Sequence, residues 1–191
     1  EDLNDHLNKA FGIDGRVVWM PKIGEDVQLH LGGSAHMRNL NDDEGEVQYR
    51  ARAGAHTTNF RLVDTGKLAA RGERSFGLAA SVQKGPFHAT AEGYWQKVRR
   101  IDGPNPTFFG GYAELGMVLT KGDKRSYKAG AYDRLSPSNP INESGMGAIE
   151  VNVRYDHLDL NDKDIVGGTQ KAAWLSLVWA PIDYVRLTAN Y

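Results

Sequence analysis

Apolar and polar residues alternate at every second position in a series of segments of about ten residues, separated by clusters of Gly, Pro, Asn and Asp. Residues 26–38 show the pattern most clearly. The apolar positions of this segment are Val27, Leu29, Leu31, Gly33, Ala35 and Met37, and the polar ones are Gln28, His30, Gly32, Ser34, His36 and Arg38. The segment is amphipathic as an extended strand and has no coherent apolar stripe as a helix.

The same alternation recurs along the chain and predicts about nine strands. The predicted segments are residues 12–20, 26–38, 47–52, 76–83, 87–96, 112–120, 149–156, 175–179 and 185–191. Each has one apolar and one polar face, and their lengths approach the nine to eleven residues with which a tilted strand crosses hydrocarbon. This pattern indicates an all-β protein, an antiparallel transmembrane β-barrel in which residues 1–191 form a single domain.

The connections and the aromatic residues agree with a barrel of this type. Lys84–Phe87 and Ala180–Asp183 are tight turns, whereas other connections are long, as in outer-membrane barrels. Aromatic residues lie toward strand ends, where a girdle would sit at the level of the lipid headgroups. They are Trp19, Trp95, Trp179, Tyr155 and Tyr191. The alternative is that these aromatic side chains cap the strands of a soluble sheet.

Strand parity singles out two connections. If the turns at 21–25 and 84–87 lie on the same side, an even number of crossings must separate them, yet only three predicted strands intervene. We therefore expect Ala55–Arg74 to supply a crossing, with Asn59–Val63 as a short strand, or to thread the lumen as a constriction. Counting onward, Lys121–Gly145 falls on the periplasmic side, where a basic stretch folded inward would affect permeation.

Composition narrows the function classes. The net charge is −1, from 23 basic and 24 acidic residues, which gives no general attraction to nucleic acid. There is no cysteine and hence no thiolate metal site or disulfide. The mean hydropathy of −0.51 and the lack of a long apolar run exclude a transmembrane helix. A barrel strand escapes that test, because only alternate residues face lipid.

Six stretches in order resemble the phosphate-selective porin O and P family of outer-membrane proteins, and together they cover nearly the whole chain. They begin at Leu29 (LHLGGSAHMRNLND), Tyr49 (YRARAG, leading to LVDTG from Leu62), Lys84 (KGPFHATAEGYW), Leu119 (LTKGDKRSYKAGAYDRLSP), Gly147 (GAIEVNVRYDHLDL) and Gly167 (GGTQKAAWLSLVWAPIDYVRLTANY).

The resemblance implies a bacterial outer-membrane barrel of about sixteen strands, usually trimeric, with an anion-attracting lumen and no cofactor or metal. Its expected partners are outer-membrane lipid, lipopolysaccharide and small anions such as phosphate or polyphosphate. It also implies a chain that is incomplete at both ends and covers roughly the C-terminal half of the family. About nine strands cannot close such a barrel, so we expect an open arc.

Arginine is the side chain best suited to passing phosphate, because its planar fork matches the anion's acceptor oxygens. Conduction also requires weak and repeated sites. Arg50 and Arg52 are two positions apart, so they share a face at about 6.5 to 7 Å. The strand resembles a run of alternating pore-lining arginines in the family. Gln48 and His56 depart from that run, and a broader anion preference fits as well.

Ten further basic residues complete the predicted anion pathway. Arg38, Arg154 and Arg186 fall on polar strand faces, Arg61, Arg71 and Arg74 lie in or beside the possible constriction, and Lys121, Lys124, Arg125 and Lys128 form a basic cluster with Arg134. The alternative is that the strand arginines are barrel-interior charges paired with Glu92, Glu114 or Glu150, and that the cluster is a hydrated loop.

Two other function classes stand beside the porin. A soluble ligand-binding β-barrel or sandwich would bury Leu29, Leu31, Leu175 and Leu177, whereas a porin turns them outward and its arginines inward. An outer-membrane phospholipase or protease needs a nucleophile beside a base, and Ser34 with His36 is the one such same-face pair. The six histidines show no metal-ligand spacing. The acidic stretch 41–44 is expected to be a solvated loop tip, with loose binding of Ca²⁺ or of lipopolysaccharide-bound divalent ions as the alternative.

Overall fold

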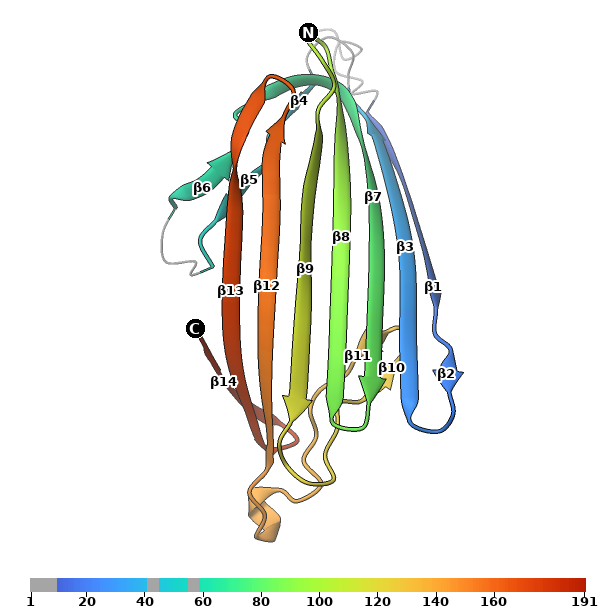
Figure 1. Ribbon diagram of the computed structural model, residues 1–191, viewed down its shortest axis with the longest axis vertical. Helices are drawn as coiled ribbons and strands as arrows, with labels where there is room; N and C mark the ends of the chain where they lie inside the picture. Colours follow the sequence, from blue (N-terminus) through green and yellow to red (C-terminus); the bar gives the residue numbers. More distant parts are fainter. Residues whose placement is uncertain (1–9, 41–44, 55–58) are drawn as a thin grey trace, which may run out of the picture.

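The computed structural model describes residues 10–40, 45–54 and 59–191, and its regular structure is almost entirely antiparallel strand (Figure 1). The strands are β1 (Phe11–Trp19), β2 (Lys22–Ile23), β3 (Val27–Asn39), β4 (Glu46–Val47), β5 (Arg50–Arg52), β6 (Arg61–Asp64), β7 (Leu68–Lys84), β8 (Phe87–Arg100), β9 (Thr107–Val118), β10 (Tyr127–Lys128), β11 (Ala131–Tyr132), β12 (Ala148–Asp162), β13 (Ile165–Ile182) and β14 (Val185–Asn190). One short 3₁₀ turn, η1 (Ile141–Glu143), interrupts the connection before β12. No helix in the described part of the chain is long and apolar enough to cross a membrane.

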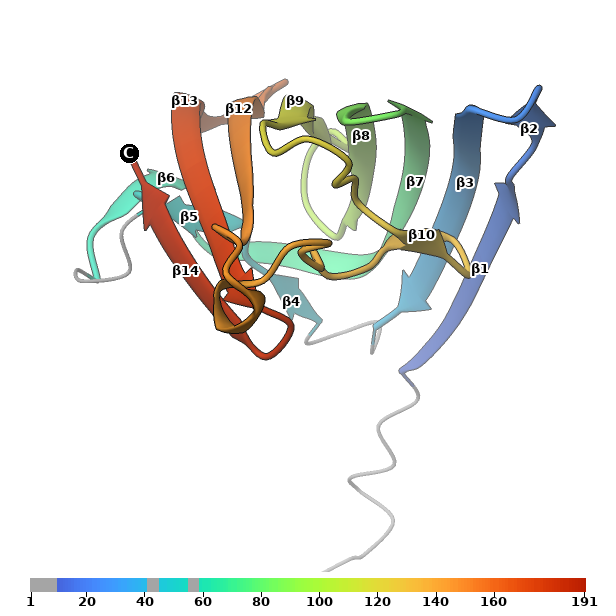
Figure 2. The same cartoon turned by 90° about the horizontal axis from the view of Figure 1, so that it is seen from below.

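Eight strands form a continuous path in the order β1-β3-β7-β8-β9-β12-β13-β14, with β2 and β4 attached to its side. Neighbours in this order also follow one another along the chain, and each ladder is antiparallel. The sheet curves, and β4, β5 and β10 lie over its concave side (Figure 2). Within the described ranges no ladder joins β1 to β14, so the sheet is an open arc, as expected.

The alternation in sequence becomes a difference between the two faces of the sheet. On β12, Val153 is exposed while Glu150 and Asn152 are buried. The apolar face is the solvent-facing, convex one across the sheet: Leu115 is 61% exposed, and Leu31, Leu78, Leu175 and Leu177 are each between 43% and 49% exposed. The polar face looks into the arc. This is the direction expected for a porin and the reverse of a soluble barrel.

The parity problem in the strand prediction was caused by residues 47–52, which do not cross the sheet. They contribute Val47 to the short strand β4 and form the whole of β5, which pairs with β6 (Arg61–Asp64) in a separate small hairpin. Two crossings, β3 and β7, then separate the tight turns, so the number is even. The expected extra crossing in 55–74 is therefore wrong, although a short strand does overlap Asn59–Val63.

Both long connections fold against the arc. Val47 and Val63, from the connection between β3 and β7, pack with Leu68, Val98 and Leu160 in the larger buried apolar cluster. The other connection, residues 119–147, is called the inner segment here, and its β10–β11 hairpin lies over the concave face (Figure 2). The sequence left open whether this basic stretch folds inward, and the structure places its hairpin over the concave face. Apolar burial thus fixes one connection at one end of the sheet, and polar contacts together with the burial of Leu135 fix the inner segment at the other.

Candidate anion pathway on the concave face

Arg154 lies in the middle of the concave face and is held by neighbours on three sides. Its Nε donates to Asp156 Oδ1 at 2.7 Å, and its Nη1 is 3.9 Å from Glu114 Oε2. Its guanidinium carbon lies 3.6 Å from the centre of the Tyr112 ring, which is a cation–π contact. The guanidinium is therefore oriented, but its charge is partly compensated. This is the Glu114 pairing that the sequence left as the alternative.

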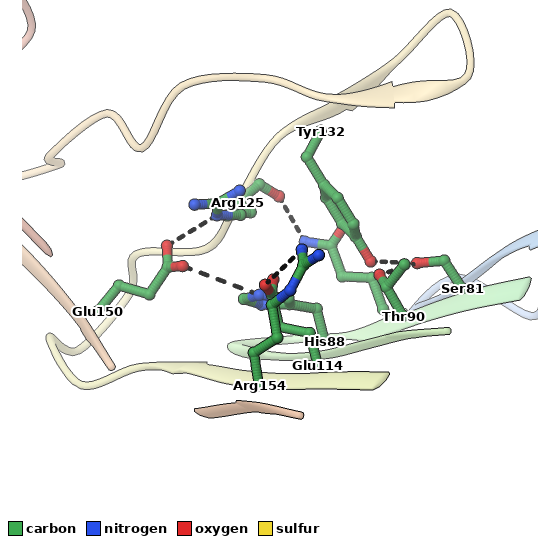
Figure 3. A network of polar contacts seen from close by, with 9 residues as sticks. Ser81, His88, Thr90, Glu114, Arg125, Tyr132, Glu150 and Arg154 are labelled. Carbon is green, nitrogen blue, oxygen red and sulfur yellow. Dashed lines mark hydrogen bonds and ion pairs between the residues drawn. The ribbon is translucent and has the colours of Figure 1, made fainter. Parts of the chain in front are cut away.

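Arg125 reaches the concave face from the inner segment and meets Glu150 of β12 (Figure 3). Arg125 Nε donates to Glu150 Oε2 at 2.8 Å, and the Glu150 side chain is completely buried. The other carboxylate oxygen lies 3.8 Å from His88 Nε2. The Gln83 side chain donates to the backbone carbonyl of Arg125. This network joins the inner segment to β7, β8 and β12.

Two tyrosines tie the β10–β11 hairpin of the inner segment to the sheet. Tyr127 hydrogen-bonds His30 of β3, and Tyr132 hydrogen-bonds Ser81 of β7. Tyr132 also packs against the His88 ring, with centroids 5.3 Å apart. Further along, Ser138 donates two hydrogen bonds to Asp123. Burial opposes ionisation of Asp123, but the hydrogen bonds from Ser138 and Thr120 outweigh it and lower the pKa of that carboxyl.

An open cleft of about 560 Å³ lies where the inner segment meets β12–β14. Three arginines line it, Arg125, Arg154 and Arg186, together with the carboxylates of Glu114 and Asp156. Arg186 on β14 is exposed and has no ion-pair partner among the described residues. Glu150 neutralises Arg125 from behind the lining, and Glu114 and Asp156 flank Arg154, so the positive charge left to meet an anion in the cleft is that of Arg186. Such a site can hold a small anion weakly.

The small hairpin of β5 and β6 brings a second group of arginines together, Arg50, Arg52 and Arg61. In the strand register, Arg52 stands opposite Arg61, and Arg50 stands opposite Asp64. Desolvation and then the positive charges of Arg52 and Arg50 lower the pKa of Arg61, which Asp64 partly offsets. Gly54 follows this group and lies against the Trp174 ring at the edge of the cleft. The hairpin therefore places arginines near the cleft, not on a wall strand.

Two other kinds of site were considered from the sequence, a metal site and a Ser34–His36 pair. No group of three metal-ligating side chains comes together there. His36 Nδ1 lies 2.5 Å from Asp14 Oδ1, but no hydrogen bond joins Ser34 to His36 among the described residues. The pair proposed for an enzyme thus lacks its nucleophile contact. The acidic stretch 41–44, with its predicted loop tip, and His56 lie outside the described residues.

The family model for phosphate-selective porin O and P matches residues 3–191 of this sequence. The chain belongs to the phosphate-selective porin O and P family. Its sequence is 48% identical to an uncharacterized protein of Caulobacter vibrioides over 186 residues, which covers 96% of this chain and 37% of that protein. It is 29% identical to Porin O of Pseudomonas aeruginosa over 220 residues, which covers the whole chain and 49% of that porin. The chain thus spans less than half of these relatives.

The structure divides the predicted pathway residues of this porin chain into groups. Arg125, Arg154 and Arg186 share the cleft, and Arg50, Arg52 and Arg61 share the hairpin. Arg38 is on the concave face, but its Nη2 forms a 2.7 Å ion pair with Glu73, whose other oxygen accepts from Tyr49. The three lysines Lys121, Lys124 and Lys128 are exposed on the inner segment, and Lys124 lines a different cavity from the cleft.

One predicted pathway residue lies on the wrong face for that role. Arg74 has the same strand parity as Phe76 and Leu78, so it is exposed on the convex face. We therefore correct the expectation that Arg74 lies in or beside a constriction. Arg71 is exposed as the extra residue of a bulge between Ala70 and Gly72, where strand parity does not fix its face. Arg16, which was not among the predicted pathway residues, lines a smaller concave-face cavity with His30 and Glu92.

Proposed function

We propose that the complete protein is a bacterial outer-membrane porin that passes small anions, phosphate or polyphosphate among them, by passive diffusion. The observation that carries this proposal is the cleft in which Arg125, Arg154 and Arg186 converge on the polar, concave face. Family membership supports it. The convex face supports it as well, because its exposed leucines are suited to contact with acyl chains.

The electrostatics favour throughput over tight binding. Two arginines of the cleft, Arg125 and Arg154, are held in place by carboxylate partners. An entering anion therefore meets partly compensated charge. Arg186 adds a cation without such a partner in the described part of the chain. Weak and repeated attraction of this kind lets an anion leave as readily as it enters. We propose a pathway from the hairpin arginines, Arg50, Arg52 and Arg61, past the cleft to the exposed lysines of the inner segment.

The rest of the assembly follows from the same proposal. The strands would continue into a barrel of about sixteen strands completed by further polypeptide, since β1 and β14 are open edges here. We propose a homotrimer surrounded by outer-membrane lipid and lipopolysaccharide, with no cofactor and no catalytic activity.

Replacement of Arg154 and Arg186 together by glutamine is expected to lower the anion selectivity of the full-length porin severalfold. Two guanidinium groups leave the cleft, so Glu114 and Asp156 lose their arginine partner and the one cation of the lining that is unpaired among the described residues is removed. The measurement is the reversal potential in planar bilayers under a phosphate gradient and then a chloride gradient. Lys171→Gln is the matched control, because Lys171 is exposed on the convex face of β13. Unchanged selectivity in the double variant, or an equal loss in the control, would contradict the proposed pathway.

The hairpin arginines give a second, independent result. Replacement of Arg50 and Arg52 by alanine should lower anion conductance, because two cations leave the proposed pathway. The barrel should stay folded, because Arg52 stands opposite Arg61 and like charges in that position repel. Single-channel conductance in phosphate and the heat resistance of the folded form on a gel would be compared for the two proteins. Conductance and selectivity equal to those of the parent would remove both residues from the pathway.

A further inference from the structure

The convex face carries a cluster of basic residues at the end of the sheet where β7 begins. Arg74 of β7 stands directly opposite Lys97 of β8, and Arg99 follows two positions after Lys97 on the same face. Arg71, at the bulge, is exposed beside them. None of these four residues forms an ion pair within the described ranges, although Arg99 Nη1 donates to the neutral Asn39 side chain at 3.3 Å.

A row of aromatic side chains runs directly below this basic cluster. Phe76, Trp95 and Phe109 are register neighbours on β7, β8 and β9. The Phe76 and Trp95 ring centroids are 6.2 Å apart, and those of Trp95 and Phe109 are 5.2 Å apart. The next convex-face residues of β7 are Leu78, Ala80 and Val82. An aromatic row between a basic row and an apolar band is the order of groups at a membrane interface.

The spacing of charges along β7 matches the thickness of hydrocarbon. Lys84, the next basic residue on the convex face of this strand, is ten positions after Arg74. Ten positions correspond to about 33 Å along a strand. A barrel strand tilted by 35 to 45° reduces that rise to about 25 Å, the height of the apolar band of an outer-membrane barrel. The basic cluster thus lies at headgroup level when the apolar band lies in acyl chains.

The cluster is unfavourable without an anion. Cross-strand partners such as Arg74 and Lys97 have Cβ atoms about 5 Å apart, and like charges at that spacing repel each other. No carboxylate on the neighbouring convex-face positions of β3, β7, β8 or β9 compensates them, since these positions hold Met37, Phe76, Trp95 and Thr107. Phosphate groups complement such a site, because both arginine forks and ammonium groups donate charge-assisted hydrogen bonds to them.

We propose that Arg74, Lys97 and Arg99 bind the phosphate groups of the lipid A portion of lipopolysaccharide, with Phe76 and Trp95 against its acyl chains. Lipid A carries two phosphates on one rigid disaccharide, so a single molecule neutralises two of the three closely spaced cations. Connections of two residues occur at both ends of the sheet, at 85–86 and 183–184 and at 163–164, so their lengths do not orient it. The position of the basic end in the outer leaflet is therefore part of this proposal.

This proposal rests on the membrane location in the proposed function but not on anion conduction. The test uses the full-length protein in nonionic detergent, titrated with bisphosphorylated lipid A and observed by native mass spectrometry. Arg74→Gln with Lys97→Gln is expected to weaken lipid A binding at least tenfold. Lys84→Gln, the matched loss of a convex-face charge at the opposite end, should leave it unchanged. The exchange Arg74→Lys with Lys97→Arg keeps both charges and should retain binding.

Three results would overturn the lipid A site. They are equal affinity in the glutamine variant and the parent, an equal loss in the Lys84→Gln control, or parent binding to phosphatidylglycerol as tight as to lipid A. The glutamine variant should keep the parent's reversal potential in a phosphate gradient. A parent that binds lipid A but has no anion selectivity would sink the proposed function while leaving the lipid site intact.

Discussion

Replacement of Leu78 by arginine is expected to lower the free energy of unfolding by about 2 to 4 kcal/mol, the cost of a basic residue at the midplane of an outer-membrane barrel. Leu78 is four positions after Arg74 and six before Lys84, so it lies near the middle of the proposed lipid-facing band. Its register neighbours are Gly33 and Gly93, and neither has a side chain that would shelter a charge. The measurement is urea unfolding of the full-length protein in phospholipid vesicles.

Thr188→Arg is the matched control for this variant. Thr188 is exposed as well, but it lines the cleft on the concave face, where an added arginine meets water and carboxylates. Its unfolding free energy should change by less than about 1 kcal/mol. Equal and small effects of the two substitutions would show that the convex face does not lie in hydrocarbon, and the transmembrane assignment would fail with it.

The alternation of residue types was sufficient to predict the sheet and the direction of its two faces. Leu31, Leu115 and Leu177 are exposed on the convex face, while Arg154 and Asn152 look into the arc, as the pattern indicated. A barrel strand needs only this period to place its side chains, because successive residues point to opposite faces. The ends of the strands were harder to predict from the sequence. β13 begins at Ile165 rather than near 175, since Gly167–Lys171 contains no apolar residue to mark the period.

The connections could not be predicted in the same way, because their contacts are made with strands distant in the sequence. Residues 47–52 alternate like a strand, yet Tyr49 turns to Glu73 and Val47 joins a buried cluster under β7 and β8. Nothing local distinguishes such a segment from a wall strand. Unlike these connections, the convex position of Arg74 could have been predicted from the sequence. It shares parity with Phe76 and Leu78, so the sequence already held the evidence that places it on the convex side.

In the candidate site, strand parity in the sequence was enough to place some arginines on the polar face. The position of another arginine depends on tertiary contacts that the sequence does not show. Arg154 and Arg186 follow from strand parity alone. Arg125 joins them only because Glu150, Tyr127 and Tyr132 fix the inner segment across the arc. Arg16 was missed although it stands opposite Ser34 in the register of β1 and β3, because segment 12–20 was predicted as a strand without its two faces being assigned.

Replacement of Glu150 by alanine is expected to release the inner segment from the concave face. Glu150 is fully buried and accepts the 2.8 Å hydrogen bond from Arg125, which leads from the inner segment to β12. Removal of one member of a buried charged pair leaves the other uncompensated, and because Arg125 is partly exposed we expect a loss of about 2 to 3 kcal/mol in unfolding free energy. A released segment should also expose its Lys121–Arg134 stretch to trypsin.

Glu114→Ala is the control, since Glu114 also faces the cleft but makes only a 3.9 Å, partly exposed contact with Arg154. Such a contact contributes less than about 1 kcal/mol, and its loss should not affect protection from trypsin. A double-mutant cycle of Glu150→Ala and Arg125→Ala then measures the coupling directly, because the two losses overlap if the pair acts as a unit. Additive losses, or trypsin protection in Glu150→Ala equal to that in Glu114→Ala, would mean that contacts other than the Arg125–Glu150 pair hold the inner segment. Overlapping losses with cleavage would identify the Arg125–Glu150 pair as the contact that keeps a cation of the inner segment inside the proposed pathway.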